Sequence, residues 1–382
     1  MTNSKRSATH RYALFGSRAT WNRRLVEKIG YPEFHVTSAQ TKHEKLEVSV
    51  GEVFDHEQLR AGTLDALHEH QAFAIDIQLL STDEQLFLYM IDRVHIELTL
   101  HAKKELFRKY VGFWKAKFKN ISLVVFQNTP HEGYDFVAYS VARMLKITTI
   151  CTYHMPVLPH LSTLIYAYTD LKQHSDTALE AASPSTYTSH SSQDELRQRA
   201  LRSIRAWESA AKSDVYNSFT RADIESRENI WHKVATIING RSRRSRASLT
   251  RLPERTCNID ALIKSKYFFF PLHYQPECSS MPLAGEYHQQ ALICALLNKF
   301  LPEGYTLVLK EHPRKSRAQW RGEEFYFQLA QLKNVRWIST DVSSRELLNG
   351  AAAAVTATGT IAWEAILLRK PVFLFGSRIF EG

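Results

Sequence analysis

The segment YTLVLKEHP (305–313) ends in side chains that suit phosphate binding. It is typical of a strand, and Lys310, Glu311 and His312 stand at its carboxyl end, before Pro313. An ammonium and an imidazole can donate hydrogen bonds to phosphate oxygens, and a histidine can also protonate or stabilise a departing nucleotide phosphate. We therefore expect Lys310 and His312 to bind a nucleotide donor, with a purely structural strand end as the alternative.

A threonine-rich turn, TATGTIAWEA (356–365), is a second candidate for donor binding. Thr358, Gly359 and Thr360 stand between an expected strand and an expected helix, where hydroxyl and backbone N–H groups can meet a phosphate or ribose hydroxyls. Glu364, one turn into that helix, is expected to reach a sugar or ribose hydroxyl. Simple N-capping by a threonine is the alternative reading of this turn.

The loop LHYQPECSSMPLAG (272–285) follows another expected strand. It carries Gln275, which we expect to contact the donor, and Glu277 between two prolines. A loop that closes a cleft between two lobes fits the same sequence. His273 stands next to an apolar strand, a setting in which a structural role is commoner than a catalytic one.

The turn PHEGYD in the first half of the chain carries the candidate acid–base residues His131, Glu132 and Asp135. Gly133 lets the backbone turn tightly. A carboxylate at a strand end can act as a general base on an acceptor hydroxyl or as a nucleophile toward an anomeric carbon. We take Glu132 as the catalytic carboxylate, with His131 beside it. Capping of the next helix by Glu132 or Asp135 is the alternative.

Other chemistries lack their signatures. The sequence contains no GxxxxGK[ST], GxGxxG, HExxH or GxSxG motif. The segment AIDIQ has one carboxylate rather than a metal-binding pair, and the four cysteines share no CxxC spacing. We expect no metal site, no cofactor and reduced thiols, with positive side chains and helix N-termini offsetting the charge of a leaving group.

The elements that must position these residues alternate between strand and helix. In the first half we expect strands at 71–79, 121–128 and 148–153, and helices at 136–147 and from Ser81 onward, with Ser81 as N-cap. Parallel strands joined by helices form an open, doubly wound sheet, whose ligands bind at the carboxyl ends of the strands. PHEGYD lies at such an end.

A second α/β domain begins near residue 262. Its expected strands cover 266–272, 305–313, 334–340, 351–359 and 371–376, and its expected helices 286–301, 323–333, 343–350 and 360–370. Polar and charged helical sequence without strands separates the two halves. We therefore predict a Rossmann-like domain at 1–171, a helical, basic insertion and linker at 172–261, and a second Rossmann-like domain at 262–382. Because the chain stops directly after a core strand, we expect this last domain to be incomplete.

Composition excludes several classes of protein. A chain of 382 residues with 44% hydrophobic and 23% charged residues is typical of a two-domain globular protein, and no run approaches the ~20 apolar residues of a membrane span. We expect a cytoplasmic protein. Its net charge of +10 favours anionic partners. The arginines Arg241, Arg243, Arg244 and Arg246 could contact an anionic membrane or belong to a solvated linker, and no nucleic-acid partner is expected.

Taken in order, PHEGYD, FFPLHYQPE, KEHP and TATGTIAWEAILLRKPVFLFG resemble the bacterial capsule polysaccharide biosynthesis family. The resemblance implies two Rossmann-like domains facing a cleft, the GT-B fold, related to bacterial Kdo transferases and sialyltransferases that use CMP-activated acidic sugars. It implies that His312 contacts the cytidine nucleotide and that Thr358 or Thr360 contacts its phosphate. The family's acidic motif is matched in part, since His131 precedes Glu132 where the family has an acid.

The function that this resemblance implies is transfer of a Kdo-like or sialic-acid-like residue from a CMP donor to a glycan or lipid-linked glycan, at the inner face of the cytoplasmic membrane. Two alternatives stay open. One is a UDP-sugar-dependent transferase or epimerase of the same fold. The other is a non-catalytic protein of capsule polysaccharide assembly or export.

Overall fold

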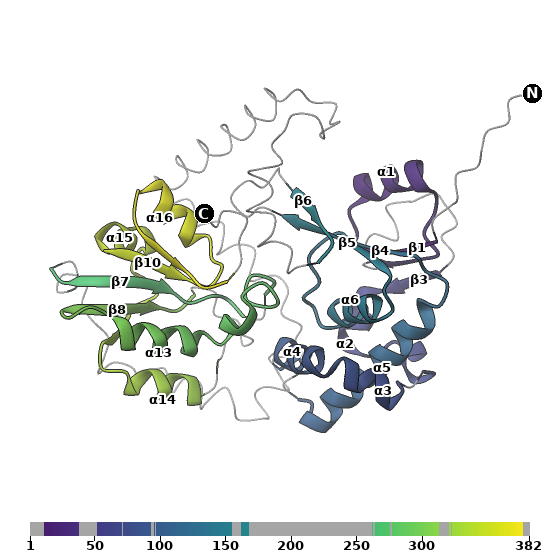
Figure 1. The fold of residues 1–382 in the computed structure, drawn as a ribbon, viewed down its shortest axis with the longest axis horizontal. Helices are drawn as coiled ribbons and strands as arrows, with labels where there is room; N and C mark the ends of the chain where they lie inside the picture. Colours follow the sequence, from purple (N-terminus) through teal and green to yellow (C-terminus); the bar gives the residue numbers. More distant parts are fainter. Residues whose placement is uncertain are drawn as a thin grey trace, which may run out of the picture. The chain divides into compact units, whose positions relative to one another are not determined.

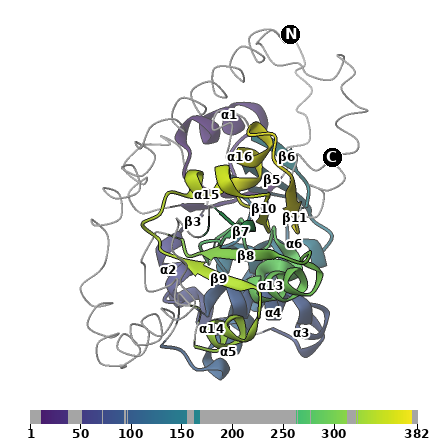
Figure 2. The same cartoon turned by 90° about the vertical axis from the view of Figure 1, so that its left-hand side faces the viewer.

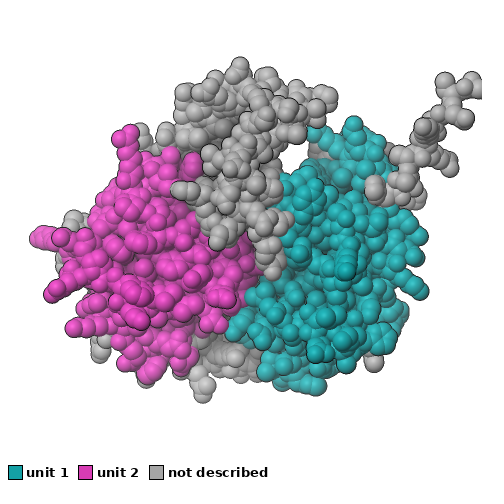
Figure 3. Space-filling model, viewed as in Figure 1, with its two compact units in different colours: residues 1–154, 162–171 teal, residues 155–161, 172–382 magenta. Residues whose placement is uncertain are grey.

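The structure, a computed structural model, divides the chain into two compact units. One comprises residues 1–154 and 162–171, and the other comprises residues 155–161 and 172–382 (Figure 3). The residues that the structure describes are 11–37, 52–70, 72–92, 95, 97–154, 162–167, 262, 264–275, 277–312, 321 and 323–376. The expected insertion at 172–261 lies outside the described residues, together with its arginines Arg241, Arg243, Arg244 and Arg246, and so does Pro313.

The first unit is built on a six-stranded sheet in the order β3-β2-β1-β4-β5-β6 (Figure 1). Its strands are β1 (Tyr12–Phe15), β2 (Phe34–Thr37), β3 (Glu52–Asp55), β4 (Leu123–Phe126), β5 (Thr148–His154) and β6 (Ser162–Ile165). Its helices are α1 (Ala19–Ile29), α2 (His56–Ala61), α3 (Ala74–Leu79), α4 (Ser81–Ile91), α5 (Leu100–Lys117) and α6 (Tyr134–Met144), with a 3₁₀ turn, η2 (Asp65–His68). All neighbouring strands are parallel except β5 and β6.

Aromatic packing holds α5 on this sheet. The Trp114 ring stacks on Phe34 of β2, with ring centroids 6.1 Å apart, and lies 5.2 Å from Phe15 of β1. Phe118 stacks on both Phe34 and Trp114. Strands that are covered on both faces have near-continuous apolar sequence. Every residue of β1 is buried, and so is every residue of β10 (Ala353–Thr356) in the second unit.

The prediction of a buried strand at 71–79 is wrong, because residues 74–79 form helix α3. Asp76 is buried and pairs with Lys115 of α5 at 2.8 Å, and it also accepts the N–H of Phe73 at 3.3 Å. Ile75 and Leu79 are exposed, so the apolar alternation did not mark a core face. The next helix begins at Ser81, but its N-cap is Leu80, without a side-chain cap, rather than Ser81.

The second unit is built on a five-stranded parallel sheet in the order β11-β10-β7-β8-β9. Its other strands are β7 (Lys266–Pro271), β8 (Tyr305–Lys310), β9 (Val335–Ile338) and β11 (Val372–Leu374). Its helices are α13 (Gln290–Phe300), α14 (Glu323–Gln331), α15 (Ser344–Gly350) and α16 (Ile361–Leu367), with a 3₁₀ turn, η5 (Gly285–His288). One core lies between the sheet and α13 and α14, and another lies between the opposite face and α15 and α16 (Figure 2).

Both sheets have the strand order of a doubly wound Rossmann-like domain, which confirms the predicted fold class, the pair of domains that a GT-B chain contains. In each unit the connections leave the two central strands in opposite directions. These strands are β1 and β4 in the first unit and β7 and β10 in the second. Ligands of such sheets bind beyond the carboxyl ends of these central strands.

The expected strands and helices of the second unit are confirmed, with ends that differ by a few residues. In the first unit the β4–α6–β5 succession is confirmed, whereas β1, β2 and β3 were not foreseen. Among the described residues, no helix is long and apolar enough to cross a membrane.

Candidate functional site

His273 connects the two central strands of the second unit. It follows β7, and its Nε2 accepts the N–H groups of Ala357 at 3.2 Å and Thr358 at 3.3 Å, directly after β10. The hydroxyl of Thr356 lies 2.9 Å from the same nitrogen. Because Nε2 accepts two backbone N–H groups, these contacts assign the neutral tautomer with its proton on Nδ1. This arrangement agrees with a structural role for His273.

Some hydrogen-bonding groups of the threonine-rich turn are already paired with other protein groups. The Gly359 N–H donates to Thr356 Oγ1 at 2.8 Å, and the Thr358 hydroxyl donates to the carbonyl of Ser279. Thr360 is the N-cap of α16 and makes no side-chain capping bond. Among the residues that the structure describes, the N–H groups of Thr360 and Ile361 have no partner either. The donors of this turn that can meet a ligand are therefore those of Thr360 and Ile361.

Lys310 is the last residue of β8, and only 5% of its surface is exposed. Its Nζ donates a hydrogen bond to Ser344 Oγ at 2.9 Å. Burial lowers the pKa of Lys310 to about 8, against the opposing effect of the Asp341 carboxylate. The ammonium is still largely charged at neutral pH, so the structure keeps a cation at the carboxyl end of the sheet.

His312 and Glu364 lie on the same edge of the sheet, at different elements. His312 is partly buried, and its ring approaches the Tyr274 ring edge-on with centroids 5.6 Å apart. Glu364 is partly buried in the first turn of α16. Burial raises the pKa of Glu364 to about 7, against the opposing effect of Arg345. A carboxyl group with this pKa can donate as well as accept a hydrogen bond near neutral pH.

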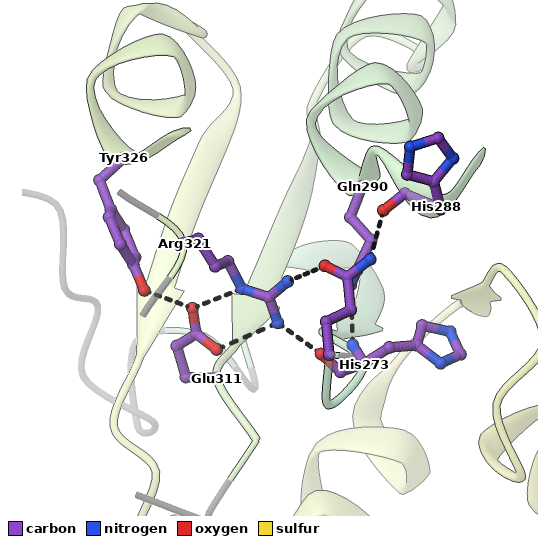
Figure 4. A network of polar contacts seen from close by, with 7 residues as sticks. His273, His288, Gln290, Glu311, Arg321 and Tyr326 are labelled. Atoms are coloured by element: carbon purple, nitrogen blue, oxygen red, sulfur yellow. Dashed lines mark hydrogen bonds and ion pairs between the residues drawn. The ribbon is translucent and has the colours of Figure 1, made fainter. Parts of the chain in front are cut away.

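An arginine that the sequence analysis did not single out joins the ends of β7 and β8 (Figure 4). The Arg321 side chain is 0% exposed, and its Nε lies 3.1 Å from Glu311 Oε1. Its guanidinium also donates to Gln275 Oε1 at 2.8 Å and to the carbonyl of His273. Tyr326 of α14 donates its hydroxyl hydrogen to the same Glu311 carboxylate at 2.8 Å. Nothing in the sequence around Arg321 indicates these partners, since they come from distant segments.

Gln275 is held from both ends of its amide. Its oxygen accepts from Arg321, and its Nε2 donates to the carbonyl of His288 at 2.6 Å. A second buried amide, that of Gln290, accepts the N–H of His273 at 2.7 Å (Figure 4). The loop after β7 is thus fixed by the side chains of Arg321 and Gln290 and by the carbonyl of His288.

The acid–base candidates of the first unit lie in the turn between β4 and α6. Asp135 accepts the N–H groups of His131 at 3.1 Å and Glu132 at 2.7 Å. Gly133 has φ +81°, and a Cβ there would meet Ile91 at 2.8 Å. Asp135 therefore shapes the turn, but the capping alternative is not confirmed, because the N-cap of α6 is Gly133 and no side chain caps this helix.

His131 and Glu132 are both partly exposed. His131 Nδ1 lies 2.7 Å from the carbonyl of Thr129 and must donate to it, which leaves Nε2 as the basic nitrogen of a neutral ring. Among the described residues, neither that nitrogen nor the Glu132 carboxylate makes a hydrogen bond. Burial raises the pKa of Asp135 to about 6, His131 lowers it, and Glu132 raises it. The turn thus presents a base and a carboxylate side by side.

A close contact between the two central strands of the first unit was not foreseen. Gly16 follows β1 and has φ +131°, and a Cβ there would lie 2.4 Å from Oε1 of Gln127, which follows β4. Gln127 accepts the N–H of Arg18 at 2.8 Å and donates to Asn22 of α1. His35 of β2 lies 2.6 Å from the carbonyl of Gly16. The glycine in FGSR was the available signal.

A metal is not suggested by the described part of the chain, where no group of three or more His, Cys, Asp or Glu side chains could hold one. Three cysteines, Cys151, Cys278 and Cys294, are free thiols. Burial strongly disfavours the Cys294 thiolate and raises the pKa of this thiol above its ordinary value.

Comparisons with solved structures give distant similarities. The UDP-GlcNAc 2-epimerase of Methanocaldococcus jannaschii is 14% identical, with a TM-score of 0.26 over 95% of this chain and 83% of that one. KpsC of Thermosulfurimonas dismutans, a β-Kdo 2,7 transferase, is 14% identical, with a TM-score of 0.32 over 77% of this chain and 76% of that one. Anabaena HepE, solved with UDP-glucose, is 12% identical, with a TM-score of 0.24 over 96% and 80%. Scores at this level transfer no functional residue.

A search of curated proteins finds no match. The family comparison does find one, because residues 260–382 match the model described as capsule polysaccharide biosynthesis protein. These residues include β7 to β11 and the candidates Gln275, Lys310, His312 and Glu364. The motifs from FFPLHYQPE onward had predicted this resemblance, and residues 260–382 are similar to the capsule polysaccharide biosynthesis family.

Proposed function

We propose that this chain is a glycosyltransferase of bacterial capsule or surface polysaccharide synthesis that transfers an acidic sugar, Kdo-like or sialic-acid-like, from a CMP-activated donor. The observation that carries the proposal is the carboxyl edge of the second unit, within the residues that match the family. Lys310 ends β8, His312 follows it, and Glu364 lies in the first turn of α16. Such an edge is where a doubly wound sheet binds a nucleotide.

Each donor-side residue has a proposed role. His312 contacts the nucleotide, and Lys310 offsets the charge of the phosphate that leaves. The Thr360 hydroxyl, with the N–H groups of Thr360 and Ile361, binds phosphate oxygens, while Gly359 keeps the turn compact because a Cβ there would lie 2.7 Å from Thr356 Oγ1. Glu364 binds a ribose or sugar hydroxyl.

In this proposal, the donor-side candidates Thr358 and Gln275 stabilise the site without contacting the ligand. The Thr358 hydroxyl and both ends of the Gln275 amide already bind protein groups. They fix the loops on which the ligand-binding groups stand. A supporting role of this kind predicts that their replacement lowers donor affinity together with stability.

In the first unit we assign acid–base chemistry to His131 and Glu132. The neutral ring of His131, oriented by the Thr129 carbonyl, can take a proton from an acceptor hydroxyl through Nε2. The Glu132 carboxylate can act as that base instead or stabilise developing positive charge at the anomeric carbon. His131→Ala and Glu132→Gln should each lower turnover by about 100-fold or more, the usual contribution of a general base.

We also assign the acceptor to the glycan or lipid-linked glycan class, at the cytoplasmic face of the membrane. The arginines Arg241, Arg243, Arg244 and Arg246 are proposed to contact anionic lipid. Sedimentation with vesicles of phosphatidylcholine, with and without phosphatidylglycerol, tests this contact. Binding that does not depend on the anionic lipid, or that survives replacement of all four arginines by serine, would remove the membrane from the proposal.

The test of the donor is a thermal-shift titration with CMP, CDP, UMP and UDP, using wild type and His312→Ala. A ligand that binds only the native state raises its apparent stability by mass action. We expect stabilisation by CMP that His312→Ala abolishes. Selectivity for UMP or UDP would indicate a UDP-sugar transferase or epimerase, and no response to any nucleotide would indicate a non-catalytic capsule protein.

A further inference from the structure

Lys310 and Arg345 are two cations of the second unit that form no hydrogen bond or ion pair with a carboxylate of the described residues. Among the described residues, the only hydrogen bond of the buried Lys310 ammonium goes to a neutral hydroxyl, that of Ser344 at 2.9 Å. No carboxylate lies within 4.0 Å of its Nζ in the described part of the chain. A buried ammonium without a counter-ion is costly, so its retention calls for a functional reason.

Arg345 directly follows Ser344 in α15. Its guanidinium makes no hydrogen bond or ion pair with any described residue, and its Nη1 is buried without a partner. An arginine has five N–H donors, which match the oxygens of a phosphate or a carboxylate two at a time. The second cation is therefore left with donor capacity that the protein itself does not use.

The nearby acidic groups do not neutralise this pair. Asp341 is exposed, and its carboxylate accepts a hydrogen bond from Ser339 at 3.2 Å. Glu364 in α16 is close enough to Arg345 for the arginine to lower its pKa, yet burial has the larger effect and leaves the carboxyl group partly protonated near neutral pH. Asp341 and Glu364 therefore interact electrostatically with Lys310 and Arg345, respectively, without forming an ion pair with either cation among the described residues.

We propose that Lys310, Ser344 and Arg345 form a subsite for an oxyanion, either a phosphate or a sugar carboxylate. Lys310 and Arg345 supply the charge, and the Ser344 hydroxyl, held by Lys310, adds a third donor. That the oxyanion belongs to an acidic sugar nucleotide rests on the proposed function, whereas the subsite itself does not. A donor of that class carries both groups, so the subsite would select acidic sugar nucleotides either through their phosphate or through their carboxylate.

Isothermal titration of the full chain tests the subsite with four probes: CMP, cytidine, N-acetylneuraminate and inorganic phosphate. The variants are Lys310→Met and Arg345→Gln, which keep most of the side-chain volume, and Ser344→Ala covers the case in which Lys310→Met does not fold. Arg336→Gln is the matched control, because Arg336 of β9 is partly exposed and, among the described residues, its guanidinium donates only to backbone carbonyls. Melting temperatures without ligand establish which variants are folded.

We expect both charge-removing variants to weaken an anionic probe by about tenfold or more, with cytidine and the control unaffected. Weaker CMP and phosphate binding identifies a phosphate subsite, and weaker N-acetylneuraminate binding identifies a carboxylate subsite. The subsite is refuted if wild type binds no anionic probe, or if folded variants bind all of them as wild type does. Loss of phosphate binding without any preference for CMP would keep the subsite and reject the proposed donor. Tight CMP binding that is unchanged in the variants, together with unchanged binding of phosphate and N-acetylneuraminate, would keep the donor and reject the subsite.

Discussion

His273 Nε2 accepts the backbone N–H of Thr358 at 3.3 Å, and this contact joins the loop after β7 to the loop after β10. The two strands are the central pair of the second sheet, so the contact lies where a doubly wound sheet binds its ligand. One side chain thereby links the loop that carries Gln275 to the turn that carries Thr358.

Replacing His273 by alanine should destabilise the protein by about 2–5 kcal/mol. The change leaves the buried N–H groups of Ala357 and Thr358 without an acceptor, and each unsatisfied group costs about 1–3 kcal/mol. Urea unfolding measures the loss. His101→Ala, at an exposed position of α5, is the control and should change stability by less than about 0.5 kcal/mol. Equal effects of the two changes would show that the His273 contacts do not hold the loops.

Arg321→Met should cost about 3–5 kcal/mol, because it leaves the Glu311 carboxylate largely buried and without its cation. If the unpaired charge causes the loss, the double variant Arg321→Met/Glu311→Gln should be more stable than the single one. Chemical denaturation of both proteins, with Arg336→Gln as control, measures the difference. A double variant that is less stable than Arg321→Met would assign the stabilisation to the contacts with Gln275 and His273 instead.

The stability of the protein should fall as pH rises from about 4.5 to about 7, in part because of Glu364. Its pKa is 4.5 in an unfolded chain and is raised to about 7 in the fold, so the folded state holds the proton more tightly within this window. The stabilisation is complete below the unfolded value and is lost by the folded one. Glu364→Gln should lack this component and be more stable than wild type at pH 8, by on the order of 1–3 kcal/mol.

Unfolding free energies of wild type and Glu364→Gln, measured from about pH 4 to about pH 8 and so on both sides of the titration window, test the sign. The exposed Glu303 supplies the control Glu303→Gln, whose difference from wild type should not vary with pH. A gap between wild type and Glu364→Gln that stays constant with pH would contradict the raised pKa.

Gly16→Ala should destabilise the first unit by more than about 2 kcal/mol, through strain at positive φ and a clash with Gln127. Gly304 also has positive φ, +78°, but a Cβ there meets nothing within 4 Å. Gly304→Ala should therefore cost about 1 kcal/mol, from the backbone alone. Thermal unfolding compares the two. Similar losses would show that the Gln127 contact relaxes without cost.

The second fold unit could be predicted from sequence because its strands are short apolar runs between helical segments. β7 and β10 have near-continuous apolar sequence, as strands covered on both faces require. β2 and β3 are four-residue segments, FHVT and EVFD, and their polar residues interrupt the apolar run that would indicate a buried strand. Segment 71–79 was misread because its apolar alternation matches a strand, whereas Asp76 is buried by pairing with Lys115, far along the chain.

The candidate site was predictable only where chemistry and strand ends coincide. Lys310 ends β8 and His312 follows it, so their place at the carboxyl edge could be deduced from the sequence. Arg321 and Arg345 could not be found in this way. Arg321 lies before a helix and binds three distant residues, and the significance of Arg345 rests on partners that it lacks among the described residues.

Hydrogen–deuterium exchange with and without saturating CMP tests the central claim, a cytidine nucleotide at the carboxyl edge of the second sheet. We predict that CMP slows exchange in peptides that contain residues 272–275, 310–312 and 358–364, which follow β7, β8 and β10. The same experiment with His312→Ala should show no protection. Protection confined to the first unit, or exchange that CMP leaves unchanged throughout the chain, would contradict the claim.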